Sequence, residues 1–290
     1  MKSRWHSKRQ LTAYLFISPF FILFLVFMAF PLVFSFYLSF HKWDGFSQPD
    51  FVGLRNYLNL FSDSTFYETL YNTVYMFLIA TPLQLIGALV LAGLLNAPST
   101  RLRSFFRAAF YMPYITCVVV ISVMFLILYD YRYGFINYFL SWIGLGGIPW
   151  IDSAAWSKIS IVLLIFWRWT GYNMVILLAG MQAIDNQLYE AARIDGAGTL
   201  QLFFRLTIPL LKPVLFFCYI LMVIGQFQLF AEPFVLTKGG PEYSSLTIVH
   251  YLYKQGFEFF RLGYASAIAY TLLAITFILS YINSRILENP

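Results

Sequence analysis

The chain has 290 residues, of which 60% are hydrophobic and only 11% are charged, and its mean hydropathy is +0.70. A soluble domain carries about 25% charged residues, so this composition excludes a soluble globular protein, a disordered chain and a coiled coil. Cys117 and Cys218 both lie in apolar runs, which excludes a disulfide framework. In such a chain the net charge of +6 bears on membrane topology and not on nucleic-acid binding.

Six apolar runs predict an all-α integral membrane protein with six transmembrane helices, forming a single domain over residues 1–290. Each run has the length of roughly 20 residues that a bilayer-spanning helix needs, and the runs lack the alternation of a β-barrel. The first run is too long for a signal peptide and no small-residue cleavage site follows it, so it is interpreted as a retained helix. The predicted spans are 11–40, 70–95, 105–129, 159–184, 210–236 and 264–282.

Charged residues are divided unevenly between the two sides that these spans create. With a cytoplasmic N-terminus, eleven basic and four acidic residues lie in cytoplasmic segments, against seven basic and eight acidic residues outside. Basic residues accumulate on the cytoplasmic side of membrane proteins. The bias therefore predicts that both termini are cytoplasmic, and the short link 96–104, with Arg101 and Arg103, supports this topology.

The external segments contain little that indicates catalysis. His41 and Asp44 are a weak metal signal, and a solvated loop role is the better interpretation. No G-x-x-x-x-G-K-[ST] or G-x-S-x-G motif occurs, which argues against ATP binding by a P-loop and against a hydrolase. Apolar residues at helical spacing over 135–143 predict an interfacial helix.

The link between the fourth and fifth spans, residues 185–209, has a different character. Asp185 or Asn186 can cap a short helix, Gly196 permits a sharp turn, and Pro209 is expected to end a second short helix. The pattern predicts a helical hairpin that protrudes into the cytoplasm. Its small residues Ala191, Ala192, Gly196 and Ala197 allow a close approach, and Phe203 and Phe204 offer apolar anchors.

Residues of this link resemble a known family. Glu190-Ala191-Ala192, followed at the family's spacing by Gly196 and by Leu206-Thr207-Ile208-Pro209, resembles the EAA loop of ABC-importer permease subunits. The run from Tyr189 to Ala197, which includes Asp195, is similar to the carbohydrate (maltose and multiple-sugar) branch of that family. Three further stretches agree, so the resemblance covers the chain from about residue 51 onward: 51–57, 70–73 and 237–241.

The resemblance implies a pore-forming permease that moves a sugar or oligosaccharide across the bacterial cytoplasmic membrane by alternating access, and that is not itself an enzyme. It implies a second permease in a heterodimer, two ATPase subunits that hold ATP and Mg, and an extracytoplasmic solute-binding protein. The chain itself would bind no cofactor, metal or nucleic acid. Coupling to the ATPase would then depend on Glu190, Ala191, Ala192, Asp195, Gly196, Ala197 and Pro209.

Polar and aromatic side chains inside the spans mark a candidate solute pathway, because such groups are costly in lipid. A sugar pocket combines aromatic faces with amide or hydroxyl groups, although packing between helices is the alternative for each residue. The candidates are Trp169, Tyr172 and Asn173 on the fourth span and Gln226 with Leu229 on the fifth, where Gln228 is expected to point elsewhere.

Similarity to the maltose-type branch places Tyr172 at a pocket tyrosine and Gln226 at an asparagine position. Leu229 replaces a second asparagine, and Trp169 replaces a glycine. Both departures argue against a maltose-shaped pocket.

Arg168 lies within the fourth span, and Glu232 lies near the external end of the fifth. The two can form an ion pair, or Arg168 can extend to the outer interface while Glu232 lies outside. A third alternative, contact between Arg168 and an anionic solute, leaves an importer of glycerol phosphate or an acidic sugar open. A secondary carrier would need inverted repeats and an intramembrane enzyme a nucleophile with a base, and the sequence shows neither.

Overall fold

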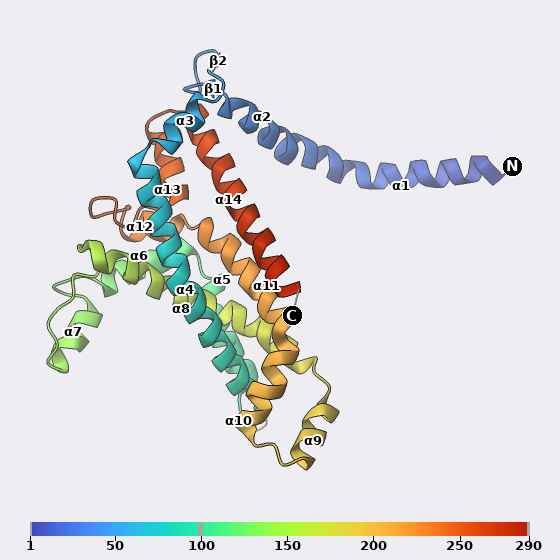
Figure 1. Ribbon diagram of the computed structural model, residues 1–290, viewed down its shortest axis with the longest axis vertical. Coiled ribbons are helices and arrows are strands. Elements are labelled where there is room, and N and C mark those ends of the chain that lie inside the picture. The colour runs from blue at the N-terminus through green and yellow to red at the C-terminus, as the bar shows by residue number, and fades with distance from the viewer. Residues whose placement is uncertain (1, 98–100, 289–290) are drawn as a thin grey trace. The chain divides into compact units, whose positions relative to one another are not determined.

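The computed structural model describes residues 2–97 and 101–288, and its architecture is almost entirely helical (Figure 1). Among these residues, five helices are long and apolar enough to cross a membrane, or six if one bent pair is a single span. The predicted all-α membrane architecture is therefore confirmed. The elements are α1 (Lys2–Phe24), the π-helix η1 (Leu25–Ala29), α2 (Phe30–Ser39), β1 (His41–Lys42), β2 (Asp50–Phe51), α3 (Arg55–Phe61), α4 (Ser64–Asn96), α5 (Arg103–Ile115), α6 (Val118–Leu128), α7 (Phe135–Trp142), α8 (Ala154–Gln182), α9 (Asn186–Ile194), α10 (Thr199–Gln201), the π-helix η2 (Leu202–Thr207), α11 (Ile208–Phe227), α12 (Ala231–Leu236), α13 (Ile248–Tyr253), the π-helix η3 (Lys254–Glu258) and α14 (Leu262–Glu288).

The chain divides into two compact units, Met1–Asp63 with Leu252–Thr271, and Ser64–Tyr251 with Leu272–Pro290. In the first unit, β1 and β2 pair antiparallel, with His41 opposite Phe51. The buried Asn56 of α3 donates from Nδ2 to the carbonyl oxygens of Ser39 and His41, both at 2.9 Å. These hydrogen bonds fix the turn that follows α2.

The loop after β1 satisfies its own polar groups. Asp44 accepts hydrogen bonds from the Ser47 N–H (2.8 Å), the Phe46 N–H (2.9 Å) and the Ser47 hydroxyl (2.8 Å). These bonds, with that of the Ser47 backbone foremost, lower the pKa of Asp44 to about 2. His41 Nδ1 of β1 lies 2.8 Å from the Tyr37 carbonyl oxygen of α2, so the side chains of His41 and Asp44 each have a local partner.

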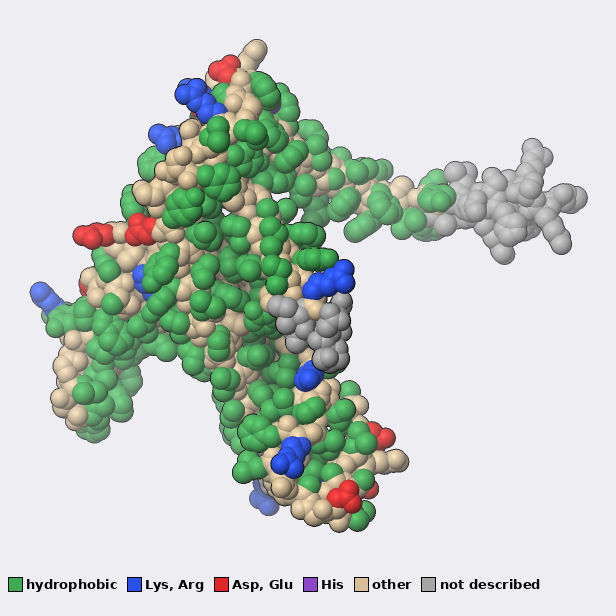
Figure 2. Space-filling view, in the orientation of Figure 1, with side chains coloured by type: hydrophobic (Ala, Val, Ile, Leu, Met, Phe, Trp, Pro, Cys, Tyr) green, Lys and Arg blue, Asp and Glu red, His purple; other side chains and the backbone are tan. Residues whose placement is uncertain are grey.

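The second unit is built on α4, which packs along α8, while α5 and α11 also pack against α8. Gly171 of α8 makes the approach of α5 possible, because a Cβ there would lie 1.7 Å from the Phe110 carbonyl oxygen. On the face shown in Figure 2, hydrophobic side chains predominate along the long helices of this unit and charged side chains are sparse. Such a surface is typical of helices in contact with lipid or with other membrane subunits.

The predicted span 105–129 corresponds to two helices, α5 and α6, which together are long and apolar enough for one span and are bent by 95°. Pro113 cannot donate a backbone hydrogen bond, and the Thr116 hydroxyl donates to the Met112 carbonyl oxygen at 2.9 Å. Thr116 and Cys117 then adopt extended conformations with ψ of 143° and 125°. The bend brings the start of α6 to the cavity described below.

The predicted span 210–236 also differs from the structure at both ends. Helical structure continues from Thr199 to Phe227, so Pro209 does not end a helix. It follows the π-helical turn η2, where the Thr207 hydroxyl donates to the Leu202 carbonyl oxygen at 3.2 Å, and such a turn can accommodate proline. The helix α11 ends before Leu229. If it continued, the Leu229 carbonyl oxygen would accept the backbone N–H of residue 233, but this residue is a proline and has none.

Candidate functional site

A cavity of about 240 Å³ lies in the second unit between α4, α6, α8, α11 and the start of α12. It collects residues that are far apart in the sequence. All six pathway residues predicted from the sequence line it: Arg168, Trp169, Tyr172, Asn173, Gln226 and Leu229.

Aromatic rings form one wall of this cavity. Trp169 and Tyr172 meet at nearly a right angle, with ring centroids 5.9 Å apart. Tyr114 of α5 packs against both, at 5.1 Å from Trp169 and 4.5 Å from Tyr172. Rings held in this way offer apolar surface to a ligand. Sequence reasoning missed Tyr114, because its role depends on how α5 is placed by the bend.

Three amide side chains that line the cavity have buried polar atoms with no hydrogen-bond partner in the described structure. They are Gln84 Nε2, Asn173 Oδ1 and Gln226 Oε1, and the residues are only 1%, 1% and 6% exposed. Asn173 Nδ2 donates to the Trp169 carbonyl oxygen at 3.0 Å, which leaves Oδ1 as the unpaired atom. Unpaired buried polar atoms cost stability, so their concentration here is typical of a ligand site. Gln84 was also missed, although a glutamine within an apolar span is itself a signal.

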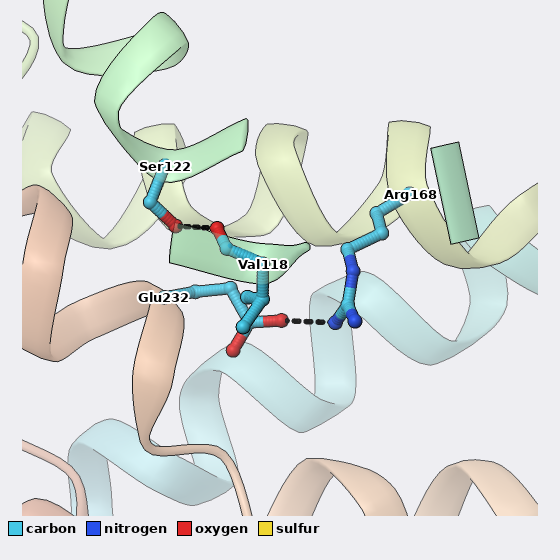
Figure 3. A network of polar contacts seen from close by, with 4 residues as sticks. All are labelled: Val118, Ser122, Arg168 and Glu232. Atoms are coloured by element: carbon cyan, nitrogen blue, oxygen red, sulfur yellow. Dashed lines mark hydrogen bonds and ion pairs between the residues drawn. The ribbon is translucent and has the colours of Figure 1, made fainter. Parts of the chain in front are cut away.

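Arg168 and Glu232 form an ion pair at the cavity, which confirms the first of the three alternatives. Arg168 Nη1 lies 2.8 Å from Glu232 Oε1, and the two side chains point toward each other (Figure 3). Their side chains are 14% and 5% exposed, so the alternatives in which Arg168 extends to the interface and Glu232 lies outside are wrong. The guanidinium also lies 5.2 Å from the centre of the Trp169 ring.

Glu232 reaches this position because the chain breaks after α11. The Leu229 carbonyl oxygen accepts the Thr247 hydroxyl at 2.7 Å in place of a helical N–H, and α12 packs against α6. The expectation that Gln228 points elsewhere is wrong, because helical spacing ends at Phe227 and Gln228 lines the cavity.

The link 185–209 forms the predicted helix, cap and turn. Asp185 caps α9 by accepting the Gln187 N–H at 2.9 Å. The Gly196 and Ala197 N–H groups donate to carbonyl oxygens of the last turn of α9, at 3.0 and 2.9 Å. This is a Schellman cap, and Gly196 adopts the left-handed φ of +84° that it requires. Tyr189 Oη lies 2.9 Å from Thr207 Oγ1, which ties α9 to η2.

The surface of this link exposes apolar and acidic side chains together, and acidic side chains are visible around α9 in Figure 2. Ile194, Leu200 and Phe204 are 85%, 74% and 61% exposed. Phe203, in contrast, packs inward against Gly93 of α4, so its interpretation as an exposed anchor is wrong. Of the predicted coupling residues, Ala192 and Ala197 are half-buried, whereas Glu190, Ala191, Asp195, Gly196 and Pro209 are exposed.

Comparison with known proteins identifies the family of this chain. The family model described as "binding-protein-dependent transport system inner membrane component" matches residues 85–287. The chain belongs to this family. It is a membrane-embedded transport subunit and not an enzyme, and it works with a binding protein and with partner subunits, among them a separate ATPase.

The alignments with named relatives cover almost the whole permease. The lactose transport system permease protein LacF of Rhizobium radiobacter is 37% identical and covers 94% of this chain and 93% of its own. The arabinooligosaccharides transport system permease protein AraP of Halalkalibacterium halodurans is 36% identical, with 94% and 87% covered. A crystal structure of a bacterial ABC transporter involved in the import of the acidic polysaccharide alginate shares the fold, with a TM-score of 0.82, 21% identity and 99% of both chains covered.

Proposed function

We propose that this permease is the pore-forming subunit of an ATP-driven importer that carries a sugar or oligosaccharide across the bacterial cytoplasmic membrane by alternating access. The observation that supports this most directly is the cavity, where an aromatic wall faces buried amides that lack partners. Sugar rings present apolar faces and many hydroxyls, which this combination suits. The names of the LacF and AraP relatives support the same class of solute.

In the proposed assembly, the whole chain acts as one permease domain and pairs with a second permease in a heterodimer. Two ATPase subunits bind ATP and Mg, and an extracytoplasmic binding protein delivers the solute, so this chain needs no cofactor of its own. The exposed Ile194, Leu200 and Phe204 support docking of the 185–209 link on an ATPase subunit. The excess of basic residues in the segments assigned to the cytoplasm supports cytoplasmic termini.

The proposal is tested by uptake into proteoliposomes that contain this chain with the permease, ATPase and binding protein encoded beside it. A panel of radiolabelled saccharides and glycerol phosphate is supplied outside with the binding protein, and ATP is enclosed. We expect accumulation of a saccharide only when ATP is inside. Uptake of glycerol phosphate alone, or uptake driven by an ion gradient without ATP, would contradict the proposal.

A further inference from the structure

Relatives and neighbours of this permease are named for solutes of different charge, lactose in one case and an acidic polysaccharide in another. Family membership therefore does not decide which charge this cavity accepts. From the Arg168–Glu232 pair we infer that Glu232 is a specificity-determining residue, which neutralises Arg168 and makes the pathway selective for uncharged saccharides. This inference rests on the proposed function and refines the substrate class.

Charge balance is the first argument. Arg168 and Glu232 are the only charged side chains among the cavity-lining residues that the structure describes, and they pair with each other. An anion that approaches Arg168 must also approach the Glu232 carboxylate, and it meets repulsion as well as attraction in a site of low dielectric constant. A neutral solute carries no such penalty.

Hydrogen-bonding capacity is the second argument. The unpaired atoms at the cavity include two acceptors, Asn173 Oδ1 and Gln226 Oε1, and two donors, Gln84 Nε2 and Arg168 Nε. A carboxylate or phosphate oxygen only accepts hydrogen bonds, so it cannot satisfy the two acceptors. A hydroxyl both donates and accepts, so hydroxyls at these positions can satisfy all four, whereas a carboxylate in place of a hydroxyl leaves an acceptor of the cavity unpaired.

Direct binding to the purified permease–ATPase complex in nanodiscs, without the binding protein, tests the inference. The probes are lactose and digalacturonic acid, two disaccharides that differ in charge, measured by scintillation proximity. We expect the wild type to prefer lactose. Glu232→Gln removes the charge that neutralises Arg168, and it should raise the affinity for digalacturonate by about tenfold or more, the effect of one charge-assisted hydrogen bond.

Three further variants separate charge from damage to the fold. The double variant Arg168→Gln with Glu232→Gln should return the preference to lactose. Arg168→Gln alone leaves the Glu232 carboxylate uncompensated, so it should bind digalacturonate more weakly than the wild type does. Glu258→Gln is the matched control, because Glu258 lies near Lys254 (4.0 Å) and does not line the cavity. It should leave both affinities unchanged.

Two results would overturn the inference: a wild type that prefers digalacturonate, or the same preference in the wild type, Glu232→Gln and Arg168→Gln. Uptake distinguishes this failure from that of the proposed function. ATP-driven uptake of an acidic saccharide would overturn the selectivity and leave the permease function intact, whereas the absence of any ATP-driven uptake would overturn the function itself.

Discussion

At the scale of single residues, the cavity shows a conflict between stability and function. Asn173 and Gln226 bury polar atoms without partners, although an apolar side chain of similar size would avoid the cost of about 1–3 kcal/mol for each unpaired group. Their presence is explained if a solute supplies the missing hydrogen bonds during transport. Sites that bind ligands commonly give up stability in this way.

Gln226→Leu should therefore stabilise the protein and weaken transport. We expect a higher unfolding temperature for the purified complex and an increase of about tenfold in the KM for the transported saccharide, which corresponds to the loss of one hydrogen bond of about 1.4 kcal/mol. Thermal unfolding monitored by intrinsic fluorescence and ATP-driven uptake measure the two effects.

Thr81→Val provides the control for this variant. The Thr81 hydroxyl is also buried and without a partner, but it does not line the cavity. Its replacement should raise the unfolding temperature and leave KM unchanged. Equal effects of the two substitutions on uptake would show that Gln226 acts only in packing.

Sequence reasoning found six of the cavity residues, chiefly because polar and aromatic groups are conspicuous in apolar spans. Trp169, Tyr172 and Asn173 follow from helical spacing on a helix that the structure confirms. Gln228 and Tyr114 could not be placed in this way, since both depend on where a helix ends or bends. Leu229 lines the cavity as predicted, but it does so from the break after α11 and not from a helical face.

At the scale of elements, the sequence predicts least well where the helices bend or end within an apolar region. Apolar composition continues through both the α5–α6 bend and the end of α11, so a hydropathy pattern treats each region as one span. The break after α11 also involves a hydrogen bond from a distant residue, that of the Thr247 hydroxyl to the Leu229 carbonyl oxygen. In contrast, the α9 cap and turn are local, and Asp185 and Gly196 predict them correctly.

The 185–209 link gives a prediction at this scale. Gly196→Trp should uncouple the transporter, so that ATP hydrolysis continues while uptake falls at least about tenfold, because a large side chain would block the close approach of the ATPase. ATPase activity and uptake are measured on the same proteoliposomes.

Gly144→Trp is a matched control for backbone strain. Gly144, in the loop after α7, has a φ of +79° and open space where a Cβ would lie, as Gly196 has at +84°. The Gly144 variant should incur the same conformational cost, about 1 kcal/mol, and remain coupled. If Gly196→Trp transported normally, the docking assignment would be wrong.

At the scale of the whole molecule, the net charge of +6 is explained by its distribution. Most of the charged residues flank the apolar segments of the sequence, as expected of a topology signal. Two of the other stretches that resemble the family, 51–57 and 70–73, each contain an asparagine that binds backbone carbonyl oxygens. Asn56 Nδ2 donates to two of them, and Asn72 Nδ2 donates to the Tyr243 carbonyl oxygen at 2.8 Å. A sequence motif alone indicates that such an asparagine matters, but only the fold shows which carbonyl it binds.

If the solute crosses through the cavity between α4, α8 and α11, thiol labelling of a cavity residue should block transport. Gln228 lines the cavity and is exposed, so Gln228→Cys is introduced with Cys117→Ser and Cys218→Ala and treated with a charged methanethiosulfonate in proteoliposomes. We predict that labelling abolishes ATP-driven uptake and that the transported saccharide slows the labelling. A fully labelled transporter that imports at the unlabelled rate would contradict the account.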